Sequence, residues 1–298
     1  MEERDAVKER GSEERGSEAR GIAMPPVSPP AMKLEPPAEA EAAPAGREPT
    51  IRLRNLSFTY PGGIRALSNI TLDIYPGQIT VLFGPSRSGK STLLRLLNRL
   101  SDLSPGARKS GEVLFEGRDI FAPDVDVSAL RRQVSMVFAI PSPLPGSIWE
   151  NLTYGLRMAG ITGQEELAAR VERSLRQAAL WDEVQDRLHQ SAFRLSGGQR
   201  QRLCLARSLA LEPVVILLDN PTSGLDPLST ATVESSLQEL KDEYTIVLVP
   251  HSVQQAARMA DRAAFLLDGE LVEVDTAARV FTAPTNRRTE DYVTGRFG

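Results

Sequence analysis

Cysteine and histidine are scarce in this chain of 298 residues, which has one cysteine and two histidines. A single cysteine excludes an internal disulfide framework and is typical of proteins kept in a reducing compartment. These residues are also too few for a protein zinc site, which usually takes four such ligands. We therefore interpret Cys204 as a small core residue and not as a nucleophile, and His189 as structural.

Long apolar runs and an excess of positive charge are also absent. No apolar stretch reaches the roughly 20 residues that a membrane-spanning helix needs, and the densely charged N-terminus does not resemble a signal peptide. Lysine and arginine together number 35, against 39 aspartates and glutamates. The sequence thus offers no basic stripe for nucleic acid. We expect a protein that stays in the cytoplasm and reaches a membrane only through a partner.

Residues 1–48 differ in composition from the rest of the chain. They contain 7 basic and 11 acidic residues, a net charge of −4 that equals the net charge of the whole chain. The pentapeptide ERGSE is repeated in this segment, and a proline-rich stretch follows. Such a segment buries too little apolar surface to offset the entropy of ordering it. We predict a disordered tail over 1–48, either inert or regulatory, and a folded domain over 49–298.

The most specific motif is GPSRSGKS, which matches the phosphate-binding pattern G-x-x-x-x-G-K-[ST]. An apolar strand is predicted before it over 79–83, and a helix with an apolar period of 3.6 after it over 91–100. A helix N-terminus offers free N–H groups to phosphate, Lys90 would reach the β- and γ-phosphates, and Ser91 would bind Mg²⁺. The predicted nucleotide-binding residues of this loop are Gly84, Pro85, Ser86, Arg87, Ser88, Gly89, Lys90, Ser91 and Thr92.

A second glycine-rich turn, LSGGQ, lies about a hundred residues later and also opens onto a predicted helix. Two anion sites far apart in the sequence suit a polyphosphate nucleotide that is held from two sides. After both turns, an apolar strand over 214–218 ends at Asp219, where a carboxylate is placed to bind Mg²⁺. Another apolar strand over 245–249 leads directly to His251.

The pattern of the remaining segments predicts an α/β fold. The runs 214–218 and 245–249 are typical of buried parallel strands, and shorter strands are indicated over 51–58 and 112–116. The segment 141–194 is helical in pattern, with a capping box at 162–165. One face of the helix that follows holds Leu167, Val171, Leu175, Ala178 and Ala179. We predict a P-loop NTPase core with a mixed or parallel sheet, and a helical subdomain inserted at about 141–194.

These motifs, together with Asp226 and His251 after them, resemble the ATP-binding subunits of ABC transporters over about residues 50–298. The segments 142–148, 186–191 and 288–298 are similar to the phosphate-importing (PstB-like) subfamily. The resemblance implies an ATPase that uses ATP and Mg²⁺ and forms a head-to-tail dimer with a second copy of itself. It further implies permease subunits as partners, an extracytoplasmic phosphate-binding protein as an indirect one, and a peripheral location on the cytoplasmic face of the cell membrane.

The same resemblance implies roles for individual residues. Tyr60 would stack on adenine, His251 would polarise the γ-phosphate end and Asp226 would contact the second copy. The LSGGQ turn, called the signature turn below, would face the nucleotide of the second copy and consists of Leu195, Ser196, Gly197, Gly198 and Gln199.

Three positions depart from the pattern of that family. Asn220 stands where the family has a catalytic Glu, and an amide cannot accept the proton of the attacking water, a loss that costs on the order of 10²–10⁴ in rate. Ala139 stands where the family has a Gln that contacts Mg²⁺. Arg87 occupies a loop position usually held by Gly, at a cost of about 1 kcal/mol if the position needs a positive φ. We expect ATP binding to survive better than hydrolysis.

Two other functions fit parts of the sequence. An ATP-binding regulatory or scaffold protein without significant hydrolysis is favoured by Asn220 and Ala139. A soluble ABC ATPase acting on ribosomes or DNA is disfavoured, because such proteins usually carry two nucleotide domains or a long insertion and this chain has neither.

Overall fold

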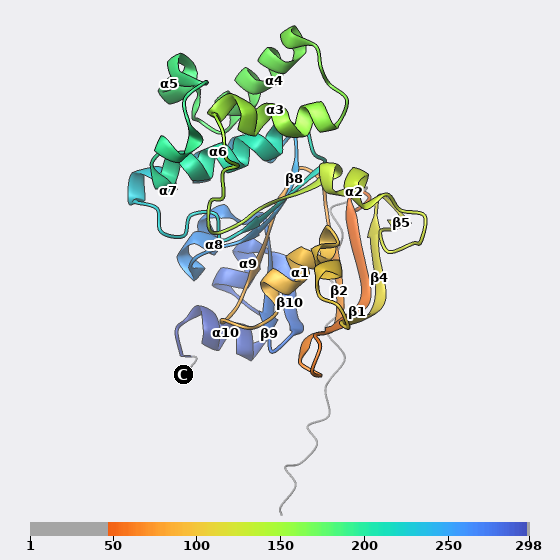
Figure 1. The fold of residues 1–298 in the computed structure, drawn as a ribbon. Coiled ribbons are helices and arrows are strands. Elements are labelled where there is room, and N and C mark those ends of the chain that lie inside the picture. Colours follow the sequence, from red (N-terminus) through yellow and green to blue (C-terminus); the bar gives the residue numbers. More distant parts are fainter. Residues whose placement is uncertain (1–46, 297–298) are drawn as a thin grey trace, which may run out of the picture. The chain divides into compact units, whose positions relative to one another are not determined.

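The structure, a computed structural model, describes residues 47–296. The predicted disorder of the tail therefore lies almost entirely outside the described residues. Figure 1 shows how the described helices and strands are arranged around two β-sheets.

The larger sheet has six strands in the order β10-β9-β3-β8-β7-β6, all parallel except β10. Strands β3, β8 and β9 are buried along their whole length, which explains why their sequences are mostly apolar. The strands predicted over 79–83 and 245–249 are confirmed, and the one predicted over 214–218 is shifted by one residue so that it ends on Asp219. The strands are β3 Ile79–Phe83, β6 Val134–Val137, β7 Val215–Asp219, β8 Thr245–Val249, β9 Arg262–Leu267 and β10 Glu270–Thr276.

The smaller sheet is antiparallel, with strand order β2-β1-β4-β5. Its strands are β1 Ile51–Thr59, β2 Arg65–Ile74, β4 Arg108–Phe115 and β5 Arg118–Asp119. The register of β1 shifts between Leu53 and Leu56, and Asn55 there has a φ of 49°. This irregularity keeps both leucines buried, although side chains three positions apart in a regular strand point to opposite faces.

The helices largely follow the predicted pattern, with three corrections. Helix α1 ends at Leu97 and not at residue 100, and Arg99 then has a φ of 59°. Helix α4 has Gly163 as its N-cap with no side-chain cap, so the capping box predicted at 162–165 is wrong. Ala179 has a φ of 49° beyond the end of α4 and is exposed, so it does not share the buried face. The helices are α1 Lys90–Leu97, α2 Val127–Gln133, α3 Ile148–Met158, α4 Gln164–Gln177, α5 Trp181–Val184, α6 Gly197–Leu209, α7 Pro227–Leu240, α8 Val253–Met259, α9 Ala277–Thr282 and α10 Arg287–Val293.

Helices α3, α4, α5 and α6 gather at one end of the fold, at the top of the view in Figure 1. Leu167, Val171, Leu175 and Ala178 of the α4 segment are buried, as the apolar period predicts. Helix α6 packs against α3, α4, α7 and β6, whereas α1 packs against β2, β7 and β8. The two glycine-rich turns therefore begin helices that belong to different parts of the fold. The division of the chain into domains stays a prediction.

The C-terminal helices support the strand that leads into the first glycine-rich loop. The ring of Tyr292 in α10 stacks on Phe265 of β9 with 5.0 Å between centroids, and Phe265 lies 5.2 Å from Phe83. Phe281 of α9 also contacts Phe83, at 5.0 Å. Phe83 is the last residue of β3, directly before Gly84. The closing run of the sequence thus contributes to the packing beneath the loop.

Within residues 47–296, no helix combines the length and the apolar content that crossing a membrane requires.

Candidate functional site

Four loops that carry predicted site residues leave the same edge of the six-stranded sheet. Strands β3, β8, β7 and β6 are parallel neighbours in that order, so their carboxyl ends meet at one edge, where α/β sheets bind ligands. The register pairs Val137 with Leu218 and Asp219 with Val249. Ala139, Asn220 and His251 follow these positions by one or two residues. The sheet therefore brings together the residues that sequence reasoning assigned to catalysis.

The first glycine-rich loop encloses the ammonium group of Lys90. Its Nζ donates hydrogen bonds to the carbonyl oxygens of Gly84 at 2.9 Å and Pro85 at 2.6 Å, and to Ser88 Oγ at 3.2 Å. Burial lowers the pKa of Lys90, and the negative charge of Asp219 acts in the opposite direction. A partly buried cation thus lies inside the loop that is predicted to hold phosphates, where it would act as a point charge.

Gly84 is held where no side chain fits. Its φ is 141°, and a Cβ built there would collide with the carbonyl oxygen of Leu266 in β9. We expect Gly84→Ala to lower the free energy of unfolding by about 3 kcal/mol or more, because the loop and β9 must separate. Gly197→Ala is the matched control, since a Cβ at Gly197 has nothing within 4 Å and its φ is not positive. Urea unfolding of both variants tests this, and equal stabilities would contradict it.

Arg87 has the positive φ that the sequence analysis considered for this loop position. Its φ is 67°, in the left-handed region that favours glycine, and its side chain is exposed at the tip of the loop. The strain of about 1 kcal/mol is therefore present in this fold. The exposed guanidinium adds a second positive charge to the loop beside Lys90.

Ser91 and Asp219 form a pair of oxygen donors at the base of the loop. Ser91 Oγ donates a hydrogen bond to Asp219 Oδ1 at 3.0 Å, although 128 residues separate them in sequence. A hydroxyl and a carboxylate are the oxygen ligands that Mg²⁺ takes together with phosphates and water. The donor set fits this ion. When bound, Mg²⁺ would neutralise charge on the phosphates.

Asn220 directly follows the end of β7 and lies beside the end of β8. Its N–H donates to the carbonyl oxygen of Val249 at 2.8 Å, and its φ of 54° is one that Asn adopts more readily than most residues. Its side-chain Oδ1 is buried and accepts no hydrogen bond within the described protein. Ala139 follows β6, and its loop is fastened by Gln201 of α6, whose Nε2 donates to the carbonyl oxygen of Phe138 at 3.0 Å. The site thus holds an unused acceptor at 220 and only a methyl group at 139.

Two further predicted residues reach this region from different elements. The hydroxyl groups of Tyr60, just after β1, and Thr92, in α1, lie 3.1 Å apart, so the structure joins the smaller sheet to the helix that follows the loop. Phe58 packs edge-on against the Tyr60 ring at 5.0 Å. The side chain of His251 is exposed, while its backbone N–H donates to Gln255 Oε1 at 2.7 Å.

The signature turn caps helix α6 with its own side chains. Ser196 is the N-cap: its Oγ accepts from the N–H of Gln199, and Gln199 Oε1 accepts from the N–H of Ser196. Gln199 Nε2 also donates to Glu183 at 2.6 Å. Leu195 is buried, whereas Ser196 and Gly197 are exposed. An exposed helix N-terminus is therefore open to an anion from outside the chain.

Gly198 and Asp226 both lie against Ser229 at the junction of α6 and α7. Asp226 is the N-cap of α7 and accepts hydrogen bonds from the N–H of Ser229 at 3.0 Å and from Ser229 Oγ at 2.6 Å. These bonds lower the pKa of Asp226. A Cβ on Gly198 would lie 2.5 Å from Ser229 Oγ. Both residues thus have a role within one chain: Gly198 lets α6 pack against Ser229, and Asp226 caps α7. These roles do not depend on the predicted contacts with a second copy.

Sequence reasoning missed two polar residues beside the predicted ones. Glu183 accepts from Gln199 and from Arg202, and although burial opposes it, these hydrogen bonds lower the pKa of Glu183. Gln255 joins three segments near His251. The sequence did contain a pattern that could have identified Gln255. Ser252 and Gln255 have the S-x-x-Q spacing of a capping box, and Ser252 is the N-cap of α8.

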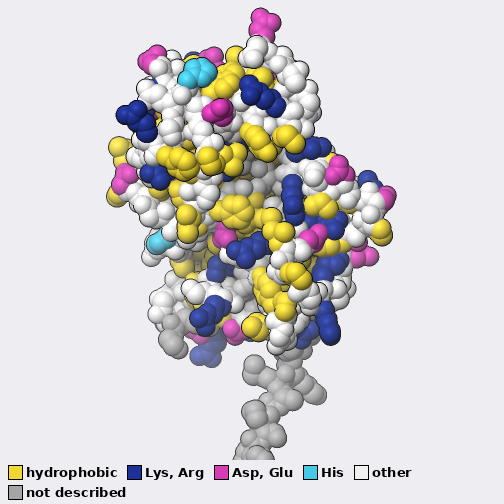
Figure 2. All heavy atoms as spheres, viewed as in Figure 1, with side chains coloured by type: hydrophobic (Ala, Val, Ile, Leu, Met, Phe, Trp, Pro, Cys, Tyr) yellow, Lys and Arg dark blue, Asp and Glu magenta, His cyan; other side chains and the backbone are white. Residues whose placement is uncertain are grey.

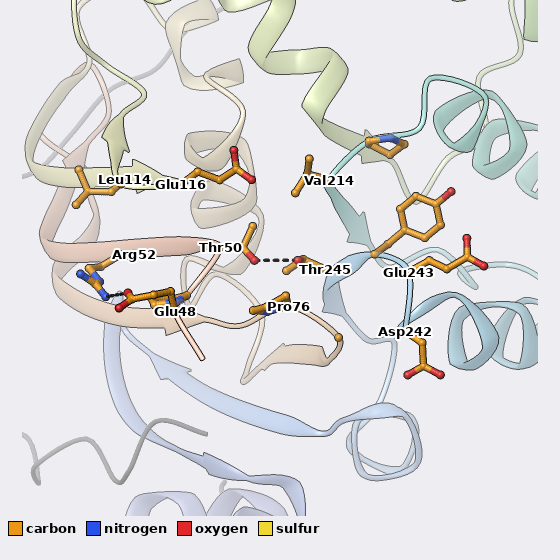
Figure 3. Close-up of a pocket in the computed structure, with 15 residues that line it drawn as sticks. Glu48, Thr50, Arg52, Pro76, Leu114, Glu116, Val214, Asp242, Glu243 and Thr245 are labelled. Atoms are coloured by element: carbon orange, nitrogen blue, oxygen red, sulfur yellow. Dashed lines mark hydrogen bonds and ion pairs between the residues drawn. The ribbon is translucent and has the colours of Figure 1, made fainter. Parts of the chain in front are cut away.

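A cavity of about 690 Å³ lies at the opposite edge of the six-stranded sheet. Figure 3 shows Val214 and Thr245 at the amino ends of β7 and β8 on one side of it, and Glu48, Thr50 and Glu116 on the other. The hydroxyl groups of Thr50 and Thr245 lie 3.1 Å apart across it. Because it is at the amino ends of the strands, this cavity is not where the predicted nucleotide residues gather.

Comparison with known proteins agrees with this geometry. A family model described as ABC transporter matches residues 67–223. The chain is 52% identical to the phosphate import ATP-binding protein PstB of Shewanella denitrificans, over 85% of this chain and 93% of that protein. It is also 52% identical to PstB 1 of Vibrio parahaemolyticus, over 83% and 91%.

Among solved structures, cbiO1 of Clostridium perfringens, part of the ABC transporter complex cbiONQ, matches with a TM-score of 0.69 and 25% identity. The match covers 83% of this chain and 96% of that one. The P-loop NTPase fold of the ABC type, predicted from the sequence, is thereby confirmed. The chain belongs to the ABC transporter family, as an ATPase of the phosphate import ATP-binding group.

Proposed function

We propose that this ATPase is the motor subunit of an importer of inorganic phosphate, which works with Mg²⁺ as a head-to-tail dimer on the cytoplasmic face of the membrane and hydrolyses ATP slowly. The observation that carries the proposal is the placement of the two anion-binding turns. Lys90 and Ser91 lie at the sheet edge, whereas Ser196 and Gly197 are exposed on a helix that packs elsewhere.

A second copy is the natural source of the missing half of the site. The signature turn satisfies its own capping bonds and leaves the exposed N-terminus of α6 for an outside anion. If each copy presents its signature turn to the nucleotide in the other copy's loop, two identical composite sites form. Such mutual exchange closes as a two-fold symmetric dimer. ATP binding would then draw the copies together, and hydrolysis would release them.

Within each site the residues divide into holding and reacting groups. Lys90 would hold the β- and γ-phosphates, Ser91 and Asp219 would hold Mg²⁺, and Tyr60 would stack on adenine. His251 would polarise the γ-phosphate end. Asn220 has a buried Oδ1 without a partner, and such an amide oxygen can orient the attacking water as a Gln does in GTPases. It cannot take the proton of that water, which supports slow hydrolysis.

The surface beside Ala139 suits a membrane partner. Phe138 and Ile140 flank Ala139 and are 44% and 77% exposed, and Tyr154 and Met158 project from one side of α3 at 60% and 71%. Leu144 joins them through Asn151, which exchanges hydrogen bonds with its backbone. Figure 2, in the same view as Figure 1, shows hydrophobic side chains gathered near the middle of the molecule. Exposed apolar surface of this kind marks an interaction site, and we assign it to the permease subunits.

Ile140→Asp tests this assignment. A charge in the centre of a desolvated apolar contact costs several kcal/mol, so we expect co-purification with the permease subunits to fall by about tenfold or more while ATP binding is retained. Ile64→Asp is the matched control, because Ile64 is 68% exposed in the turn between β1 and β2. Equal retention of the permease by both variants would contradict the assigned surface.

The cargo and the alternatives need a transport measurement. Vesicles that contain this chain with its permease subunits and receptor should take up phosphate in an ATP-dependent way, and sulfate should not compete. Permease binding without transport or ATP turnover would favour the alternative of an ATP-binding regulatory or scaffold protein. Asn220 and Ala139 are the residues that support this alternative. Co-purification with ribosomes in place of membrane proteins would overturn the proposal.

A further inference from the structure

One buried amide connects three segments around the proposed reaction site. Gln255 in α8 is 3% exposed. Its Oε1 accepts from the N–H of His251 at 2.7 Å, and its Nε2 donates to Thr222 Oγ1 at 2.9 Å and to Glu234 Oε1 at 3.0 Å. One side chain therefore joins the loop after β8, the loop after β7 and helix α7.

The chemistry of the partners fixes which way this amide points. A backbone N–H can only donate and a carboxylate can only accept, so the oxygen of Gln255 must face His251 and its nitrogen must face Glu234. Glu234 is held in turn by Arg258, whose Nη2 lies 3.0 and 3.3 Å from its two carboxylate oxygens. Gln255, Thr222 and Glu234 are 3%, 6% and 15% exposed, so this part of the network is shielded from water, whereas Arg258 at its end is 58% exposed. Shielded and fully paired polar networks hold their members rigidly.

We propose that Gln255 is a positioning residue for ATP hydrolysis, which sets the distance between His251 and Asn220 by tying their loops together. Thr222 comes two residues after Asn220, and Gln255 is the link between it and the backbone of His251. Gln255 does not itself reach the nucleotide. The proposal rests on the proposed roles of His251 and Asn220. Since small displacements of reacting groups lower rates steeply, loosening this link should act on kcat.

The test compares the single variant Gln255→Glu with a double variant in which the side chains of Gln255 and Glu234 are exchanged, so that the net charge is unchanged. Gln255→Glu keeps the acceptor for His251 but loses both donated bonds and places two carboxylates together, so we expect kcat to fall by about tenfold or more with the KM for ATP within about twofold. In the double variant Gln255→Glu with Glu234→Gln, the amide at 234 can donate to the carboxylate at 255, so the hydrogen bond between the two positions forms again in the reverse direction. We expect it to recover kcat to within about threefold of the unchanged protein, because the link is remade.

A matched control separates positioning from general stability. Gln238 bridges the same two helices, with Nε2 donating to the carbonyl oxygen of Met259 at 3.2 Å, but it touches neither loop. Gln238→Glu should lower the melting temperature without lowering kcat measured well below it. If Gln255→Glu behaves like Gln238→Glu, or if the double variant does not recover, Gln255 has only a structural role and the inference is overturned.

His251→Ala distinguishes this failure from that of the proposed site. An unchanged kcat in His251→Ala contradicts the proposed role of His251, and with it this inference. A lowered kcat in His251→Ala with an unchanged kcat in Gln255→Glu overturns the inference and leaves the proposed site standing.

Discussion

Replacing Asn220 by Glu is expected to raise the kcat for ATP hydrolysis by about 10²-fold, within the 10²–10⁴ that a general base contributes. The carboxylate would stand where Asn220 now has an unpaired buried acceptor at the end of β7. The backbone limits the gain, because a φ of 54° suits Asn better than Glu and costs about 1 kcal/mol. Steady-state release of phosphate from Mg·ATP measures the effect.

Asn220→Gln is the control for this substitution. It has the length of Glu and bears the same backbone strain, but it remains an amide, so kcat should stay near that of the unchanged protein. Equal rates for Asn220→Glu and the unchanged protein would show that Asn220 does not limit turnover.

Adding Ala139→Gln to Asn220→Glu should raise the rate further and alter the dependence on Mg²⁺, since a carbonyl oxygen is then available to the ion.

Two variants that cannot dimerise alone, Lys90→Ala and Ser196→Arg, are expected to dimerise with each other around ATP when they are mixed. Lys90→Ala removes the cation that lies inside the loop. Its charge-assisted bonds to the phosphates, of about 1.5–3 kcal/mol each, would be lost, so we expect the affinity for ATP to fall by about 10²-fold or more. Ser196→Arg blocks the exposed signature turn and should prevent dimerisation. In a head-to-tail dimer the mixed pair keeps one complete site, made of the Ser196→Arg copy's loop and the Lys90→Ala copy's signature turn.

Light scattering together with retention of labelled ATP measures this rescue. Each variant alone should stay monomeric at millimolar Mg·ATP, and an equal mixture should form dimers that hold one ATP. Arg87→Ala serves as a control for the loss of positive charge from the same loop, and it should dimerise unaided. A mixture that behaves like its separate components would refute the exchange of signature turns between copies.

The site residues differ in how far sequence reasoning could place them. The loop 84–92 was predictable because its motif is local: strand, turn and helix follow one another, and the structure has β3 and α1 on either side of it. The pairing of Ser91 with Asp219 followed only from the family pattern, since the parallel pairing of β3 with β8 and of β8 with β7 brings residues far apart in the chain to one edge. The capping box at 162–165 failed because the helix began one residue later than the motif requires, at Gln164.

The chain's sequence alone determined which chemistry is available. It supplied a phosphate loop, a signature turn and a carboxylate that we propose binds Mg²⁺, and it showed amide and methyl groups at 220 and 139, because these depend on residue identity and short spacing. Only the tertiary structure decided that Arg87 and Asn220 have a positive φ, that Gly198 packs on Ser229, and that Gln255 joins the loops of His251 and Thr222. Those facts depend on register and packing between segments far apart in the chain, and no local pattern encodes them.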